Sequence, residues 1–134
     1  MSNKLNTEES FNITNLTRDK IPGVPFAKIK NAVLGKNYSL SLVFVGDKKS
    51  QELNRSYRGK NKPTNVLSFP LDRKNGEIFI NLKLAKKEAR GLNRDFKNFV
   101  TFLFIHGLMH LKGYGHGSTM EKAETKLLKK FGFE

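Results

Sequence analysis

Residues 95–116 of this chain read DFKNFVTFLFIHGLMHLKGYGH and contain its longest apolar stretch. Apolar side chains recur at three- and four-residue spacings from Phe99 to Leu111, which predicts an α-helix with apolar residues on more than one face. Asp95 is placed to cap the start of this helix, and Gly113 is placed to end it. We therefore expect a largely buried helix at the centre of the fold.

The rest of the chain alternates between strand and helix patterns without strict βαβ order. The expected strands are 11–16, 39–45, 66–71 and 77–81, and the other expected helices are 24–34, 47–57, 82–90 and 118–131. Asp47 is predicted to cap its helix, and Ser118 with Glu121 forms a capping-box pattern. This order favours an α+β fold, in which a small mixed β-sheet is covered by helices.

Length and composition agree with one folded domain. The chain has 134 residues, of which 37% are hydrophobic, enough to bury a single core. We expect residues 1–10 to be a flexible N-terminal segment and residues 11–134 to form one domain. The first ten residues, MSNKLNTEES, lack the apolar core of a signal peptide, and no apolar stretch is long enough to span a bilayer. We therefore expect the protein to be cytoplasmic and to have no membrane partner.

Charge and cysteine content limit the partners and ligands. The formal net charge of +13 favours phosphate-rich partners such as nucleic acids, although many basic chains merely carry solvated lysines. The sequence has no cysteine, which excludes disulfides and thiolate metal sites. Any metal ligand must therefore be a histidine or a carboxylate.

All three histidines of the chain lie within residues 106–116. His106 and His110 are four positions apart on the expected helix, so both imidazoles project from one face. Gly113 lets the chain leave the helix, and His116 follows three residues later. Three neutral nitrogen ligands, with a fourth position left for water, are typical of a catalytic zinc site.

Other interpretations of this cluster stay open. A lone buried histidine is more often a core residue, but three at this spacing favour a metal site. A structural zinc would need a carboxylate as fourth ligand, and nickel, cobalt or copper also bind imidazole. The spacing matches that of metzincin peptidases, H-E-x-x-H-x-x-G-x-x-H, yet Gly107 stands where their Glu acts as general base. A peptidase is therefore disfavoured.

Two sequence blocks together resemble the YbeY family of bacterial endoribonucleases. The block HGLMHLKGYGH at 106–116 is similar to that family's H-G-x-x-H-L-x-G-Y-D-H. The block LNRSYRGKNKPTNVLSFP at 53–70 is similar to its L-N-x-x-Y-R-x-K-D-x-P-T-x-V-L-S-F-P. Asn61 and Gly115 depart from these patterns, because the family usually has Asp at both places.

The resemblance implies a zinc-dependent, single-strand-specific endoribonuclease with a zincin-like site on the buried helix. His106, His110 and His116 match the family's ligands for one zinc ion. Arg58 matches its functionally important arginine, whose guanidinium can hold a phosphate and offset developing charge. The implied substrates are ribosomal RNA precursors, including the 3′ end of 16S ribosomal RNA, and a role in ribosome quality control is implied as well. Ribosomal subunit proteins are candidate partners. DNA is not expected as a partner.

Further candidates lie between these two blocks. Lys60 and Lys62 are candidates for holding the RNA backbone, although loop lysines are usually just solvated. Ser68 and Phe69 are candidates for lining a cleft. More commonly, however, a strand Phe belongs to the core and a strand Ser has no specific role. The main alternative function is a zinc-containing RNA-binding or ribosome-assembly factor with little catalytic activity, which the charge fits equally well.

Overall fold

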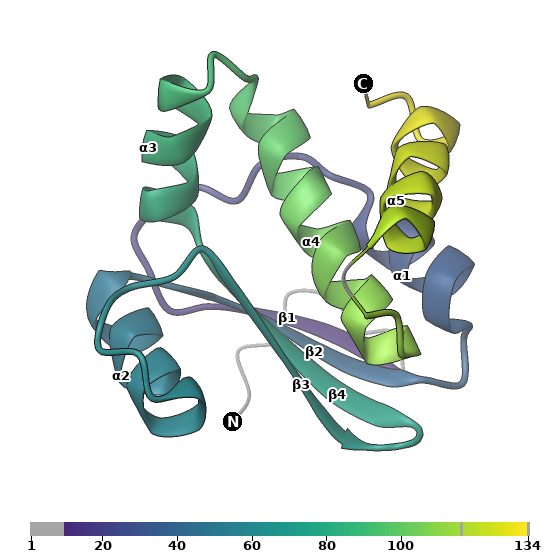
Figure 1. Cartoon of the computed structure of the whole chain (residues 1–134), viewed down its shortest axis with the longest axis horizontal. Helices are drawn as coiled ribbons and strands as arrows, with labels where there is room; N and C mark the ends of the chain where they lie inside the picture. Colours follow the sequence, from purple (N-terminus) through teal and green to yellow (C-terminus); the bar gives the residue numbers. More distant parts are fainter. Residues whose placement is uncertain (1–9, 116, 134) are drawn as a thin grey trace.

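The computed structural model describes residues 10–115 and 117–133, which have an α+β architecture (Figure 1). Within these residues, four strands form one sheet in the order β1-β2-β4-β3. The strands are β1 (Phe11–Asn15), β2 (Ser39–Val45), β3 (Val66–Asp72) and β4 (Asn75–Asn81). β1, β2 and β4 are parallel to one another, whereas β3 runs antiparallel to β4 at one edge. The predicted small mixed sheet is therefore confirmed.

Five helices of the described chain cover this sheet. They are α1 (Phe26–Leu34), α2 (Asp47–Arg58), α3 (Leu82–Gly91), α4 (Phe96–Lys112) and α5 (Ser118–Lys130). Helix α4 crosses one face of the sheet, and it contacts α1 and α5 on one side and α3 on the other (Figure 1). The buried central helix of the prediction is thus α4.

Strand alternation places α2 and α4 on opposite faces of the sheet. Successive side chains of a strand point to opposite faces. On β4, Ile78 lies against Gly107 of α4. The side chain of Asn81, an odd number of positions further on, instead bonds to Asp47 and Ser50 of α2. The two helices therefore reach the β3 edge from different sides.

Helix α4 begins and ends as predicted. The Asn98 backbone N–H donates a hydrogen bond of 3.0 Å to Oδ2 of Asp95, which caps the helix. Gly113 ends it in the left-handed conformation, with φ 107°, which glycine adopts without steric cost. The buried residues of α4 are Phe99, Val100, Thr101, Leu103, Phe104, Ile105, Gly107, Leu108 and Met109.

Aromatic rings fill the space between α4 and the sheet. The ring centroid of the fully buried Phe104 lies 5.0 Å from that of Phe26, at an interplanar angle of 88°, and 6.5 Å from that of Phe11. Phe26 also contacts Phe44 of β2, at 5.7 Å. Tilted and edge-to-face pairs add about 0.5–1.5 kcal/mol each beyond area burial. This packing fixes α4 on the sheet.

Two predicted helix caps are wrong. Gly46 and Gly117 are the N-cap residues of α2 and α5, and no side-chain hydrogen bond caps either helix. Asp47 and Ser118 are instead the first helical residues. The Asp47 carboxylate accepts a hydrogen bond from Asn81, 34 positions along the chain, so a long-range contact replaces the local one.

The part of the chain that the structure describes has no helix long and apolar enough to cross a bilayer. Of the predicted flexible segment 1–10, Ser10 alone is described, and its carbonyl accepts a hydrogen bond of 2.9 Å from the Leu40 backbone N–H. Residues 1–9 lie outside the described residues. Their flexibility, and the extent of one domain over 11–134, stay predictions.

Replacing Phe104 tests whether its packing holds α4 on the sheet. Phe104→Ala should lower the free energy of unfolding by about 3–5 kcal/mol, because it removes a fully buried ring and leaves a cavity. Leu92→Ala is the control, since Leu92 is 60% exposed, and it should change that free energy by less than about 0.5 kcal/mol. Urea denaturation measures both. Similar small losses in the two variants would contradict the packing account.

Candidate functional site

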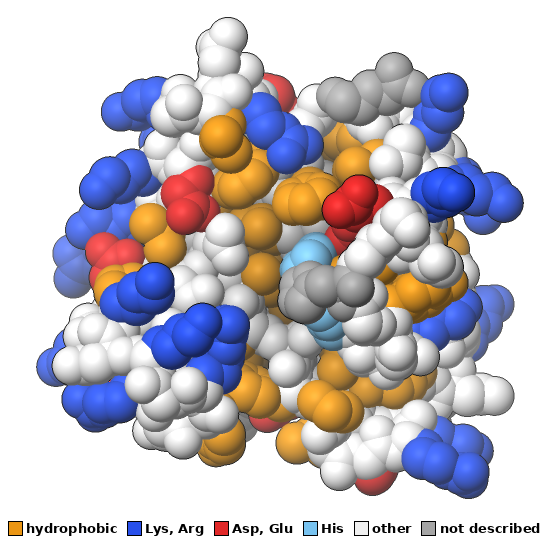
Figure 2. Space-filling view, viewed as in Figure 1, with side chains coloured by type: hydrophobic (Ala, Val, Ile, Leu, Met, Phe, Trp, Pro, Cys, Tyr) orange, Lys and Arg blue, Asp and Glu red, His pale blue; other side chains and the backbone are white. Residues whose placement is uncertain are grey.

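A cleft of about 620 Å³ lies along the free edge of β3. Helix α2 contributes Tyr57 and Arg58 to its walls, α4 contributes His106 and His110, and residues 64–69 run between them. Figure 2 shows this face hollowed near its middle, with histidine side chains bordering the hollow. The structure thus brings the predicted arginine and two of the three predicted histidines to one cleft.

The position of β3 explains how these side chains meet. Because α2 and α4 cover opposite faces of the sheet, only an edge strand lets both line the same space. Ser68 and Phe69 on β3 also line the cleft, as the sequence suggested. No described strand pairs with the outer edge of β3, and such an edge offers backbone N–H and C=O groups to a ligand.

The side chains of His106 and His110 face each other on α4. Their Nε2 atoms are 3.1 Å apart, and their ring planes make an angle of 84°. Two nitrogens bound to one tetrahedral zinc ion, at about 2.0–2.1 Å each, would lie roughly 3.3 Å apart. The geometry of the pair therefore fits two ligands of a single ion of that size.

Helix α5 holds the other ring nitrogen of His106. Nδ1 of His106 lies 2.6 Å from Oε2 of Glu124, whose residue is only 5% exposed. A carboxylate on the far nitrogen of a metal-binding histidine orients the ring and fixes its tautomer. Sequence reasoning missed this role of Glu124, because the two residues are 18 positions apart and no local spacing links them.

The third predicted ligand, His116, lies outside the described residues. Within 10–115 and 117–133, no group of three or more His, Asp or Glu side chains is arranged to hold a metal ion. The described pair is consistent with zinc in its nitrogen spacing, its donor chemistry and the carboxylate behind His106. His116 as the third ligand stays a prediction.

Arg58 is exposed at the last position of α2. Gly59 ends the helix in the left-handed conformation, with φ 68°, and its N–H donates to the carbonyls of Arg55 and Asn54. No Asp or Glu side chain belongs to the described lining of the cleft. A guanidinium on such a wall favours an anionic ligand and is well shaped to bind a phosphate.

Lys60 and Lys62 are exposed on the loop beside the cleft, and neither belongs to its described lining. This loop, residues 59–65, connects α2 to β3. A role in RNA binding stays a prediction for both lysines.

Side chains of α2 hold this loop in place. Nδ2 of Asn54 donates a hydrogen bond of 2.9 Å to the carbonyl of Lys62. Nε2 of Gln51 donates one of 3.0 Å to Oδ1 of Asn61. An Asp at position 61 would offer the same acceptor, so this departure from the family pattern keeps the contact. Gly115 is the second departure from the family pattern. A β-carbon at this position would meet no described atom within 4 Å, so the described residues leave room for a side chain there.

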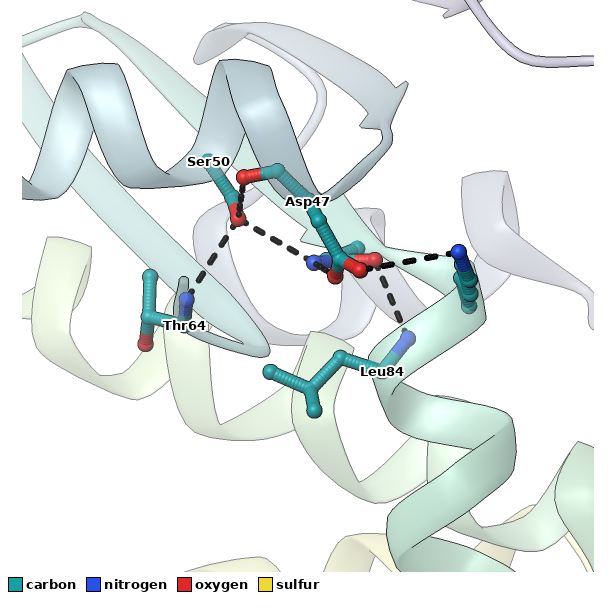
Figure 3. A network of polar contacts seen from close by, with 6 residues as sticks. Asp47, Ser50, Thr64 and Leu84 are labelled. Atoms are coloured by element: carbon teal, nitrogen blue, oxygen red, sulfur yellow. Dashed lines mark hydrogen bonds and ion pairs between the residues drawn. The ribbon is translucent and has the colours of Figure 1, made fainter. Parts of the chain in front are cut away.

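A buried polar network joins the start of α2 to the loop and to α3 (Figure 3). Nδ2 of Asn81 donates to Oδ1 of Asp47 at 2.9 Å and to Oγ of Ser50 at 3.1 Å. Oδ1 of Asn81 accepts from the Leu84 backbone N–H at 3.1 Å and so caps α3. Oγ of Ser50 also accepts from the Thr64 backbone N–H at 3.4 Å. The side chain of Asn81 therefore joins α2 to α3, and Ser50 links this pair to Thr64 at the cleft.

Comparison with known proteins identifies the family. The family model described as endoribonuclease YbeY matches residues 4–132. The chain belongs to the YbeY endoribonuclease family. It is 40% identical to the endoribonuclease YbeY of Rhizobium etli in an alignment 107 positions long, and this match covers 69% of this chain and 63% of that protein. The endoribonuclease YbeY of Ehrlichia canis is 43% identical in an alignment 105 positions long, and this match covers 71% of this chain and 68% of that protein.

A solved structure supports the fold. The solution structure of a Thermotoga maritima protein matches with a TM-score of 0.65 and covers 90% of this chain and 88% of its own. The two sequences are 24% identical, so this likeness shows the fold alone. The α+β architecture is thus shared with a protein of distant sequence, and the resemblance to the YbeY family that the two motif blocks predicted is confirmed.

Replacing Asn81 tests the network around the cleft. Asn81→Ala should lower the free energy of unfolding by about 2–4 kcal/mol, because it removes the cap of α3 and leaves buried polar groups without a partner. Asn37→Ala, at an exposed turn position, is the control and should be nearly neutral. Thermal and urea unfolding measure both variants. An Asn81→Ala protein as stable as its control would show that the network is not needed.

Proposed function

We propose that this chain is a zinc-dependent endoribonuclease that cleaves single-stranded RNA in the cleft along β3. The observation that carries the proposal is that Arg58 and the pair His106 and His110 line the same cleft, although they come from opposite faces of the sheet. A cation for the phosphate beside a candidate metal site suits phosphodiester hydrolysis. Family members named endoribonuclease YbeY support the same activity.

In this proposal, His106, His110 and His116 hold one zinc ion, and Glu124 orients His106 from behind. Zinc held by three neutral nitrogens supplies Lewis-acid chemistry and a water of lowered pKa. Arg58 binds the scissile phosphate through two guanidinium N–H groups. It stabilises the charge that develops as water adds to phosphorus and the bond from phosphorus to the leaving ribose oxygen breaks.

Packing at Gly107 argues against the peptidase alternative. A β-carbon at this position would lie 3.1 Å from Cδ1 of Ile78 and 3.4 Å from its Cγ1 and Cγ2. Ile78 is fully buried, so a side chain at 107 would require this core residue to shift by a few tenths of an ångström. The close approach of α4 to β4 is thus poorly compatible with the general base that zinc peptidases need at this position.

We further propose ribosomal RNA precursors as substrates, including the 3′ end of 16S ribosomal RNA, and ribosomal subunit proteins as partners. The proposed compartment is the cytoplasm, and neither DNA nor a membrane is a proposed partner. The family and the net charge of +13 support this assignment. A charge of this sign attracts RNA through its phosphates and makes association sensitive to salt.

An RNA-binding or ribosome-assembly factor with little catalytic activity is the second candidate. A separate groove of about 740 Å³ beside α3 favours it. The cations that line this groove are Lys20, Lys83, Lys86, Lys87 and Arg90. Such a surface can bind an RNA backbone without cutting it. The two candidates differ in whether purified protein cleaves the RNA that it binds.

Replacing Arg58 tests the catalytic proposal. Arg58→Ala should lower kcat for single-stranded RNA by about 100- to 1,000-fold, because it removes a group that stabilises charge in the transition state. Arg55→Ala is the matched control, since Arg55 is exposed on the same helix, carries the same charge and is not part of the described cleft lining. Equal activities of the two variants, or no cleavage by zinc-loaded wild-type protein, would contradict the proposal.

Replacing Glu124 tests the metal site without an activity assay. Glu124→Gln should weaken zinc binding by about 10- to 100-fold, because the amide orients His106 less strongly than the carboxylate does. Glu121→Gln, at an exposed position of α5, should leave the affinity unchanged. Competition with a chromophoric chelator measures both constants. Equal affinities would show that Glu124 has no part in the metal site.

A further inference from the structure

Tyr57 carries a large ring that the fold leaves mostly in water. Its residue is 67% exposed, although it lies at the end of α2 next to Arg58 and lines the cleft. The ring centroids of Tyr57 and Phe69 are 4.8 Å apart, at an interplanar angle of 48°. Phe69 in turn lies 5.8 Å from Phe79, at 65°. We name these three residues the aromatic ladder.

Core packing does not account for the exposed end of this ladder. The rings that hold α4 surround Phe104 on the opposite face of the sheet. Phe79 shares the α2 face with Asn81, because the two are two positions apart on β4. Phe69 supports Tyr57 from one side, while the rest of the tyrosine ring is open to solvent. The contact with Phe69 restrains the ring on one side, and a restrained ring loses less entropy on binding.

We propose that Tyr57, supported by Phe69, is a stacking platform for an unpaired nucleobase of the RNA whose phosphate Arg58 holds. The platform rests on the proposed function, because it takes RNA as the ligand of the cleft. Every base has a π-face, so stacking on an aromatic side chain tolerates any sequence. Bases inside a duplex are already stacked on both sides, so the platform favours single strands.

The charges around Tyr57 favour a nucleic acid over a protein partner. Arg58 follows Tyr57 directly, and the exposed Lys60 and Lys62 lie on the loop that continues from it. Aromatic rings interleaved with cations are the usual composition of surfaces that bind single-stranded nucleic acids, where rings take bases and cations take phosphates. An apolar protein interface is instead depleted of lysine.

Binding to two probes of equal length separates stacking from charge. The probes are a short oligouridylate and an abasic strand with the same number of phosphates. Tyr57→Ala should weaken binding of the oligouridylate by about 5- to 150-fold, the range found when a stacking ring is removed. It should leave binding of the abasic strand unchanged. Tyr57→Phe should restore binding, because the ring is kept. Fluorescence anisotropy measures the dissociation constants, and a gel checks that the RNA stays intact.

The controls distinguish this proposal from the others. Leu92→Ala removes an exposed apolar side chain outside the cleft and should bind both probes like wild type. If Tyr57→Ala weakened binding of both probes equally, or of neither, the platform would be overturned. The proposed RNA cleavage would not be affected by that result. Ring-dependent binding by a protein that does not cleave RNA would uphold the platform and overturn the nuclease. A change in the sedimentation of free Tyr57→Ala protein would instead assign the ring to a protein interface.

Discussion

The burial of α4 against the sheet is the constraint on which the other features depend. Gly107 has no side chain, and a β-carbon at this position would lie only 3.1 Å from Cδ1 of Ile78, so the close approach of the helix to the sheet depends on glycine. Phe104, one turn earlier, fills the space on the sheet with tilted and edge-to-face ring contacts. Because residues three or four positions apart share a helix face, fixing this helix also fixes the direction of His106 and His110.

Because β3 is an edge strand, the packing of α4 on the sheet brings its histidines to the same cleft as Arg58 of α2. Within the residues that the structure describes, β3 is paired on one side only, and residues 59–65 connect it to α2. A polar network centred on Asn81 holds the α2 side, and the bond between Glu124 and His106 holds the α4 side. Both halves of the cleft are thus positioned by contacts outside it, which suits a site that must bind a flexible strand.

Local patterns in the sequence were sufficient to predict much of the fold. Helix α4 could be predicted because its apolar spacing, its cap at Asp95 and its stop at Gly113 all lie within one segment. The end of β3 was harder to predict. The strand continues past Pro70 to Asp72, and its pairing with β4 is irregular between these two residues. An edge strand tolerates proline, but the sequence does not say which strand is at the edge.

The candidate site was predictable where its residues form motifs and was not where contacts are long-range. The spacing of His106 and His110 placed them on one helix face, and the family pattern drew attention to Arg58. Nothing local linked Glu124 to His106, or Tyr57 to Phe69, because each pair comes from elements that only the tertiary fold brings together. The same holds for Asp47, whose bond to Asn81 replaces the cap that its position suggested.

Zinc and RNA binding at the β3 cleft is tested most directly by a crystal structure of the full chain with zinc and a non-cleavable single-stranded RNA, recorded at the zinc absorption edge. We expect one anomalous peak bonded to Nε2 of both His106 and His110, with an RNA phosphate on the guanidinium of Arg58. RNA bound away from the β3 edge, or a zinc peak remote from the two histidines, would contradict it.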